Sequence, residues 1–187
     1  MIYGGIADFG GRNGTLAGAL PLRYRSTGDE LPYLGMVALN GDYVQEMIQE
    51  GILTDVIKHE MGHALGFGAS GLSHFGLVNG SNYIGVNGVR EYNNYTGFQS
   101  AYVPLESSGG AGTAGSHWST SIFQNELMEG WISTSMPLSR LTIAAFEDMG
   151  YDVNYNAAET VNLAKIIGTS IKTLIDTDKI ISKYNLN

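Results

Sequence analysis

The stretch HEMGHALGFG, residues 59–68, decides how this sequence is interpreted. It places two histidines four residues apart, with a glutamate directly after the first. Positions i and i+4 of an α-helix lie on one face, so His59 and His63 can direct imidazole nitrogens at a single metal ion. Glu60 would then lie beside that ion. The pattern predicts a zinc site on a helix, of the kind that zinc peptidases use.

The residues around this stretch supply the helix that the pattern requires. Thr54 or Asp55 can cap its N-terminus, and Gly66 or Gly68 can end it. In this setting Glu60 can take a proton from water and later pass one to a leaving amine. Zinc lowers the pKa of its bound water and polarises a carbonyl as a Lewis acid. The alternative is an ordinary helix with two histidines and an unremarkable glutamate.

A catalytic zinc site needs a third protein ligand. In the pattern H-E-x-x-H-x-x-G-x-x-H the third histidine comes six residues after the second, but here that position is Ala69. The residues alone leave three alternatives open. One is a carboxylate from a later helix, for which Glu147 is the candidate, and the others are His74 and His117.

The remaining sequence predicts a mixture of strands, helices and irregular chain. Tyr33 to Leu39 reads as a strand, and DYVQEMIQEG (42–51) as a short helix that ends at Gly51. We expect loops around weak strands in residues 1–28, and an irregular region with a hairpin in residues 69–116. The last part of that region, SSGGAGTAGS, is interpreted as a flexible loop. A helix is expected after Ser139, ending at Gly150, and another in the last thirty or so residues.

Composition excludes several classes of protein. The 187 residues suggest a single domain, and a net charge of -8 argues against nucleic-acid binding. The chain has no cysteine, so neither disulfides nor thiolate metal sites are possible. No apolar run is long enough to span a bilayer, and the first residues lack the pattern of a signal peptide. The protein is therefore expected either to stay inside the cell or to be a mature or fragmentary form.

Three segments in order resemble a known family. HEMGHALGFG, followed after a long insertion by SHW (116–118) and then NELMEG (125–130), is similar to the leishmanolysin-type branch of the metzincin zinc peptidases. In that branch the chain turns back after the glycine of the zinc-binding helix, and a large insertion precedes the third histidine. A methionine in a tight turn then passes beneath the metal. The resemblance covers roughly residues 30–155.

The resemblance implies a role for each matching residue. The metal ligands of one catalytic Zn²⁺ fall on His59, His63 and His117, and the general base falls on Glu60. Met128 would support the site from below without binding zinc, and Gly66 would be the turning glycine. The third ligand is thus displaced by the insertion to 54 residues after His63. Gly130 stands where some other metzincins place a tyrosine ligand, so no tyrosine switch is expected.

The resemblance also implies the fold class. We expect an α+β, metzincin-like zincin with a mixed N-terminal sheet, an active-site helix and a mostly irregular or helical C-terminal part. Residues 1–155 would form the catalytic domain, with a shortened N-terminus, and residues 156–187 a helical tail. Little sequence precedes residue 30, so the chain is expected to be a fragment, a natural short form, or a subunit that a partner chain or a missing N-terminal segment completes.

The predicted function is a zinc-dependent endopeptidase that acts on a peptide or protein substrate, with no other cofactor. An extended peptide would add to the sheet edge near Tyr33 to Asn40. The alternative is a catalytically inactive metzincin-like module that binds or supports a larger assembly. The intact Glu60 opposes this alternative, because a purely structural zinc site needs no base. The resemblance suggests a secreted or extracellular location, although the residues themselves leave the compartment unknown.

Overall fold

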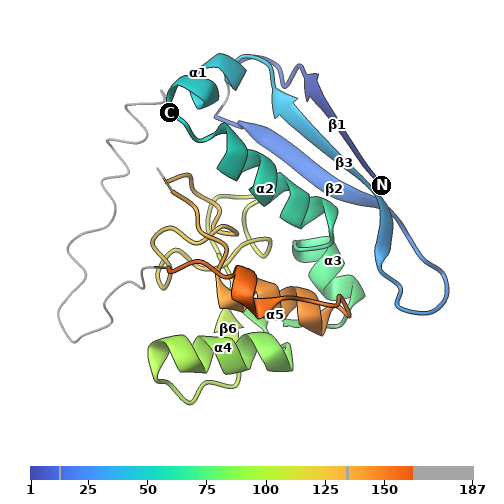
Figure 1. Cartoon of the computed structure of the whole chain (residues 1–187), viewed down its shortest axis with the longest axis vertical. Coiled ribbons are helices and arrows are strands. Elements are labelled where there is room, and N and C mark those ends of the chain that lie inside the picture. Colours follow the sequence, from blue (N-terminus) through green and yellow to red (C-terminus); the bar gives the residue numbers. More distant parts are fainter. Residues whose placement is uncertain (13, 134, 162–187) are drawn as a thin grey trace.

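The computed structural model describes residues 1–12, 14–133 and 135–161 (Figure 1). The helix predicted for the C-terminal tail therefore lies, from residue 162 onward, outside the described residues. The last described element is the short 3₁₀ helix η1, Tyr155–Ala157. The predicted domain boundary at residue 155 stays a prediction.

A mixed three-stranded sheet forms the N-terminal part. It has the order β1-β3-β2, with β1 (Ile2–Ala7) parallel and β2 (Ala17–Tyr24) antiparallel to the central strand β3 (Pro32–Asn40). The strand predicted at Tyr33 to Leu39 is confirmed, and the weak strands expected among loops in residues 1–28 are present as two strands of six and eight residues. Glycines in β1 and Pro21 in β2 weaken the strand pattern, and pairing with β3 overrides that weakness.

Two helices follow the sheet. The short helix predicted before Gly51 is present as α1, Val44–Gln49, and Gly51 has a positive φ of 72°. The next helix, α2, spans Leu53–Ala64. Its N-cap is Ile52 without a side-chain hydrogen bond, so the prediction that Thr54 or Asp55 caps it is wrong.

Helix α2 lies between the sheet and the rest of the chain (Figure 1). Its contacts with β2 and β3 place it against one face of the sheet. The approach is close at one point, because a Cβ on Gly35 would lie 2.9 Å from the carbonyl oxygen of Ala64. Glycine in the central strand therefore lets α2 lie close to the sheet.

The region predicted to be irregular contains more regular structure than expected. After helix α3 (Ala69–His74), a short hairpin pairs β4 (Val78–Asn79) with β5 (Asn82–Tyr83), and β6 (Val103–Pro104) adds to β5. The expected hairpin is thus confirmed. An 11-residue helix, α4 (Val86–Thr96), follows it and was not predicted.

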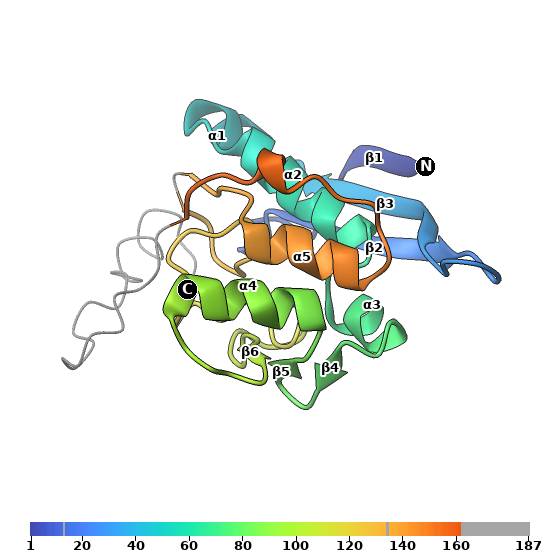
Figure 2. The ribbon, with the colours of Figure 1, turned by 60° about the horizontal axis from the view of Figure 1, so that its bottom comes forward.

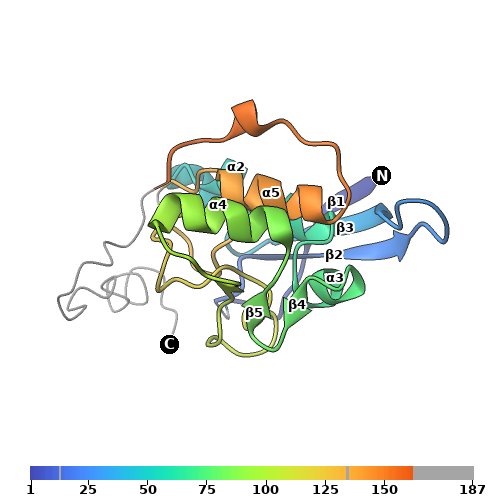
Figure 3. The same ribbon diagram turned by 90° about the horizontal axis from the view of Figure 1, so that it is seen from below.

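Tertiary contacts explain why α4 forms. Its sequence contains three asparagines, two tyrosines and one glycine, which are modest or poor helix formers. The carboxylate of Asp148 accepts hydrogen bonds from the N–H groups of Asn87 and Gly88 at 2.9 and 2.8 Å. Asp148 belongs to α5, Arg140–Asp148, which lies beside α4 (Figures 2 and 3). A neighbouring helix thus supplies the cap that the sequence of α4 lacks.

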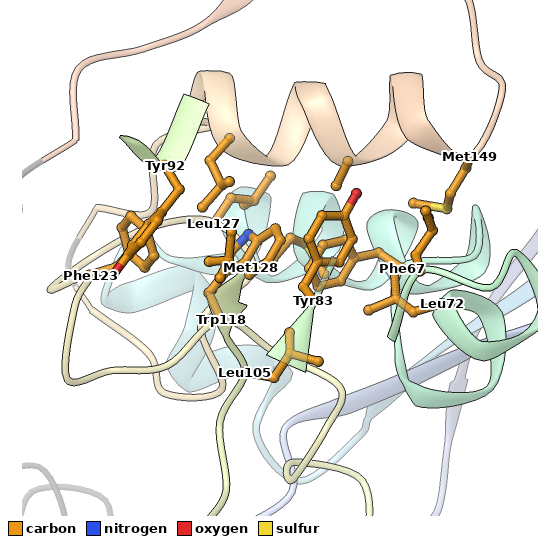
Figure 4. Packing of buried hydrophobic residues seen from close by; sticks show 14 of the residues in the cluster. Phe67, Leu72, Tyr83, Tyr92, Leu105, Trp118, Phe123, Leu127, Met128 and Met149 are labelled. Carbon is orange, nitrogen blue, oxygen red and sulfur yellow. The ribbon is translucent and has the colours of Figure 1, made fainter. Parts of the chain in front are cut away.

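The main hydrophobic core lies among α3, α4, α5 and the chain that connects them (Figure 4). Trp118 is fully buried, and the centre of its ring lies 5.0 Å from the ring centre of Phe67 and 5.1 Å from that of Tyr83. Its indole N–H donates to Thr142 at 2.8 Å. As predicted, Ser139 caps α5, and Gly150 follows its end with a φ of 102°. The residue directly after His117 is therefore held in place by this core.

The described part of the chain mixes small sheets with short helices, and the predicted class is confirmed at that level. Among the described residues, no helix combines the length and the apolar character needed to cross a membrane.

Candidate metal centre and cleft

Two histidines of α2 come together because they lie one turn apart on the same helix. The Nε2 atoms of His59 and His63 are 2.9 Å apart. Beyond them the chain turns at Gly66 and Gly68, which have positive φ values of 108° and 149°. Residues other than glycine rarely adopt these angles, so the turn explains the glycines at positions 66 and 68.

His117 completes the group from the far end of the insertion. Its Nε2 lies 3.1 Å from that of His63 and 3.2 Å from that of His59. Among the described residues, these three histidines are the group that could hold a metal ion. The structure thus brings together the three predicted ligands, although their role as ligands stays a prediction.

Backbone carbonyls set the orientation of all three rings. The Nδ1 atoms of His59, His63 and His117 lie 2.6, 2.6 and 3.0 Å from the carbonyl oxygens of Leu127, Phe67 and Thr113, respectively. A carbonyl can only accept a hydrogen bond, so each Nδ1 carries the ring hydrogen. Each Nε2 then presents a lone pair toward the other two.

The histidines are held in their neutral form. Burial, together with the neighbouring His63 and His117, lowers the pKa of His59 well below its usual value. Burial and His117 lower the pKa of His63 to about 4, and burial lowers the pKa of His117. Neutral imidazole is the form that binds metal ions.

This donor set fits zinc. Nitrogen ligands at the usual distance from a tetrahedral zinc ion lie about 3.3 Å apart, close to the spacing of these atoms. Three converging lone pairs repel one another unless a cation lies among them. Hydrogen bonds from Nδ1 to carbonyls are also the usual support for zinc-binding histidines.

The other two candidates for the third ligand lie elsewhere. The ring of His74 packs on Tyr24, with ring centres 4.2 Å apart. The carboxylate of Glu147 accepts a hydrogen bond from the hydroxyl of Tyr155 at 2.6 Å. Neither belongs to the histidine group.

Glu60 lies beside the histidines and is 6% exposed. Burial raises the pKa of its carboxyl to about 7, and its Oε2 has no hydrogen-bond partner among the residues that the structure describes. A carboxyl group with a pKa near neutrality can both accept and donate a proton. The chemical environment is therefore suited to acid–base work.

Met128 is fully buried beneath α2. A Cβ on Gly62 would lie 2.6 Å from its sulfur, so the glycine between the histidines makes room for the methionine. The supporting role of Met128 stays a prediction, and the structure places its side chain directly against Gly62.

A buried glutamate that the sequence did not single out holds the turn at Met128. The carboxylate of Glu126 accepts the backbone N–H of Met128 at 2.5 Å, and the hydroxyls of Ser139 and Thr142 at 2.6 and 2.5 Å. These bonds tie the turn to the start of α5. The signal that could have revealed Glu126 is a carboxylate directly before two apolar residues that are both buried.

The histidines open into a cleft of about 790 Å³. One wall is strand β2, from Ala17 to Pro21, and another is the glycine-rich segment between Gly109 and Thr113. The expectation that a substrate meets the sheet edge near Tyr33 to Asn40 is wrong, because β3 is paired on both sides. The edge strand at the cleft is β2.

Comparison with known proteins agrees with this geometry. The family model of leishmanolysin, peptidase M8, matches residues 13–185. A leishmanolysin homolog from Crithidia fasciculata is 31% identical over 160 residues, which is 78% of this chain and 24% of that protein. Leishmanolysin from Leishmania major is 29% identical over 181 residues, or 90% of this chain and 29% of that protein.

A shorter match covers part of the chain. A leishmanolysin-like peptidase from Drosophila pseudoobscura pseudoobscura is 43% identical over 67 residues, or 35% of this chain and 10% of that protein. The chain thus spans less than a third of the length of these relatives. Since the family model matches nearly the whole chain, the chain belongs to the leishmanolysin family of peptidases.

Proposed function

We propose that this chain carries a zinc-dependent endopeptidase site with His59, His63 and His117 as ligands and Glu60 as the general base. The observation that carries the proposal is the convergence of three Nε2 atoms, 2.9 to 3.2 Å apart, in a cleft that also holds a buried carboxyl group. Catalytic zinc sites use three protein ligands and leave a position for water or substrate. A metzincin-like catalytic domain in residues 1–155 belongs to the same proposal.

The chain's own residues would divide the work. When bound, zinc would lower the pKa of a water molecule to near neutrality and would polarise the carbonyl of a peptide bond. Glu60 takes a proton from the water whose oxygen attacks the carbonyl carbon. As the C–N bond breaks, Glu60 passes that proton to the amine nitrogen. Met128 and the three backbone carbonyls keep the ligands in one arrangement.

A peptide substrate would lie along β2 as an additional strand. The free edge of β2 lines the cleft. A peptide that adds to this edge as a strand forms backbone hydrogen bonds that do not depend on its own sequence. Pro21 has no N–H group, so we expect the pairing to end there. A secreted or surface location, which the family suggests, remains part of the proposal. No contact in the described chain favours the inactive module.

Metal analysis of the purified chain tests the ligands. We expect zinc to bind in a one-to-one ratio, His117→Ala to lose it, and His74→Ala to retain it as the matched control. Zinc loss in His74→Ala with retention in His117→Ala would overturn the assignment. Glu60→Gln should keep zinc and lower the rate of peptide cleavage by about a hundredfold or more. Undiminished cleavage in that variant would refute the role of Glu60.

A further inference from the structure

The glycine-rich loop, residues 107–116, forms part of the cleft wall but has few side chains that could anchor it. Its sequence is SSGGAGTAGS, and its largest side chain is a threonine. All four of its glycines have positive φ values, between 74° and 97°. Glycine loses more conformational entropy on folding than any other residue, and residues 107–112 are exposed, so the loop buries little apolar surface in return. Polar contacts are therefore needed to hold it in one conformation.

The carboxylate of Glu106, the residue directly before the loop, provides such contacts. Its side chain is buried, and Oε1 accepts the N–H groups of Ser107 and Ser108, both at 2.9 Å, and the hydroxyl of Ser108 at 2.7 Å. The other oxygen, Oε2, accepts the N–H and the hydroxyl of Thr120 at 3.2 and 2.9 Å. One carboxylate thus joins the start of the loop to a residue that lies three positions beyond His117.

The backbone of Glu106 binds the same stretch of chain. Its N–H donates to the carbonyl of His117 at 2.9 Å, and its carbonyl accepts the N–H of Gly115 at 2.8 Å. Residues 107–120 therefore close on Glu106 from both sides. The closed stretch contains the loop and the third proposed metal ligand.

The side chain of Glu106 lies away from the metal site itself. Among the described residues, neither the histidine group nor the lining of the cleft includes it. Its influence would pass through the loop, because the carbonyl of Thr113 lies 3.0 Å from Nδ1 of His117, and Ala111 and Gly112 line the cleft. A shift of the loop would therefore change both the wall and the direction of the ring.

We propose that Glu106 is a positioning residue, which holds the glycine-rich loop as a preformed wall of the cleft and, through Thr113, keeps the ring of His117 directed at the other two histidines. The role given to His117 rests on the proposed function, whereas the closure of the loop does not. Because the loop is ordered in the free protein, a substrate need not order it on binding, which favours tighter binding.

Zinc affinity, measured by competition with a chelator, tests the effect on the ligand. Glu106→Gln keeps one acceptor oxygen and turns an NH2 group toward the donors at the other end, so one end of the loop loses its anchor. We expect its zinc affinity to fall by about 10- to 100-fold, the usual effect of removing a contact that supports a ligand. Unchanged zinc affinity in Glu106→Gln would overturn the proposal.

The matched control is Asp148→Asn. The carboxylate of Asp148 also accepts several hydrogen bonds, from the hydroxyl of Tyr83 and the N–H groups of Asn87 and Gly88, but it lies outside the cleft. This variant should be less stable than the wild-type chain, yet its zinc affinity should stay within about twofold, because distant sites act independently. An equal loss of affinity in both variants would show a general loss of stability and would also overturn the proposal.

Hydrogen exchange of the metal-free chain tests the closure of the loop without zinc or substrate. In Glu106→Gln the amides of Ser108, Gly115 and Thr120 should exchange about tenfold faster or more, while those of α4 stay unchanged. Asp148→Asn should show the reverse. If the wild-type chain neither binds zinc nor cleaves peptides and this pattern holds, the proposed function fails while the closure of the loop by Glu106 stands. If zinc binds and exchange is unchanged, Glu106 has no such role and the proposed metal site stands.

Thr120→Val keeps the carboxylate of Glu106 and removes one of its donors, so it provides the test if Glu106→Gln does not fold. Its zinc affinity should fall in the same direction by a smaller factor. With cobalt(II) in place of zinc, the visible absorption reports the arrangement of the ligands. The bands should shift in Thr120→Val and stay in place in Asp148→Asn. Bands and affinity that match the wild-type chain in Thr120→Val would refute the positioning role.

Discussion

A Cβ added to Gly62 would lie 2.6 Å from the sulfur of Met128 and 3.0 Å from its methyl carbon. Position 62 lies on α2 between His59 and His63, so the methionine packs against the turn that carries both histidines. The absence of a side chain at position 62 is therefore what allows this contact. The contact connects Met128, beneath the proposed metal site, to the helix that presents two of the proposed ligands.

Gly62→Ala is expected to destabilise the protein, although alanine favours helices by about 1 kcal/mol over glycine. The added methyl group must displace a fully buried side chain, and such overpacking typically costs about 1–3 kcal/mol. Urea unfolding of the zinc-loaded chain measures the net loss. Gly5→Ala is the matched control, because a Cβ there meets nothing within 4 Å. Combining Gly62→Ala with Met128→Ala should cost less than the sum of the two single changes, and simple additivity would argue against the contact.

Glu126→Gln is expected to loosen the turn at Met128. The carboxylate accepts hydrogen bonds from Met128, Ser139 and Thr142. The side-chain NH2 group of glutamine is a donor, so it would face one or more of these donors and leave them without an acceptor. Leaving buried donors unpaired costs about 1–3 kcal/mol each. We therefore expect a loss of several kcal/mol in unfolding free energy together with weaker zinc binding.

The control for this change is Glu147→Gln. The carboxylate of Glu147 accepts a hydrogen bond from the hydroxyl of Tyr155, but the side chain is 38% exposed. Replacing it should therefore lower the free energy of unfolding by less than about 1 kcal/mol. If Glu126→Gln were as mild as Glu147→Gln, the buried network would not be what holds the turn.

The two-histidine helix could be predicted from the sequence because its evidence is local. Spacing, flanking glycines and the glutamate all lie within ten residues, and α2 forms where the pattern places it. The displaced third histidine has no local signal. In the structure the backbone N–H of Ala69 donates to the hydroxyl of Ser116 at 3.3 Å. The position that lacks a histidine thus lies beside the residue that precedes His117, and only the folded chain brings the two together.

The elements that the sequence predicted weakly or not at all depend on distant partners. The N-terminal strands β1 and β2, expected only as weak strands among loops, extend over six and eight residues because they pair with β3. Helix α4 depends on Asp148, which lies some sixty residues away along the chain. The Oε1 atom of Glu129, which has no hydrogen-bond partner among the described residues, is likewise apparent only in the fold, since its neighbours come from separate segments.

The stability of the protein should depend on pH through Glu129. Burial, followed by repulsion from Glu126 and Glu106, raises its folded-state pKa to about 9, above the ordinary value of 4.5 for a glutamate. The protonated form therefore contributes its full stability below pH 4.5, and this contribution is lost as the pH rises through about 9. Glu129→Gln cannot ionise, so its stability relative to the wild-type chain should increase between pH 5 and pH 9.

Urea unfolding of the metal-free chain at pH 5, 7 and 9 measures this difference. The gain should reach about 1 kcal/mol or more, because one unit of pKa shift corresponds to about 1.4 kcal/mol. Comparing variant and wild type at each pH removes the contributions of the other titrating groups. A constant difference across the three pH values would show that Glu129 ionises without cost in the folded chain.

Gly130→Ala should weaken zinc binding more than it weakens the fold. A Cβ at this position would lie 2.7 Å from the methyl group of Thr113 and 3.4 Å from the ring of His117. Thr113 also provides the carbonyl that accepts the Nδ1 hydrogen of His117, so displacing it rotates the third proposed ligand away from the other two. Changes to such supporting contacts typically reduce metal affinity by about 10- to 100-fold. Zinc affinity from competition with a chelator, set beside urea unfolding of the metal-free chain, separates the two effects. Gly5→Ala again serves as the control, and unchanged affinity in Gly130→Ala would mean that the orientation of His117 does not depend on this contact.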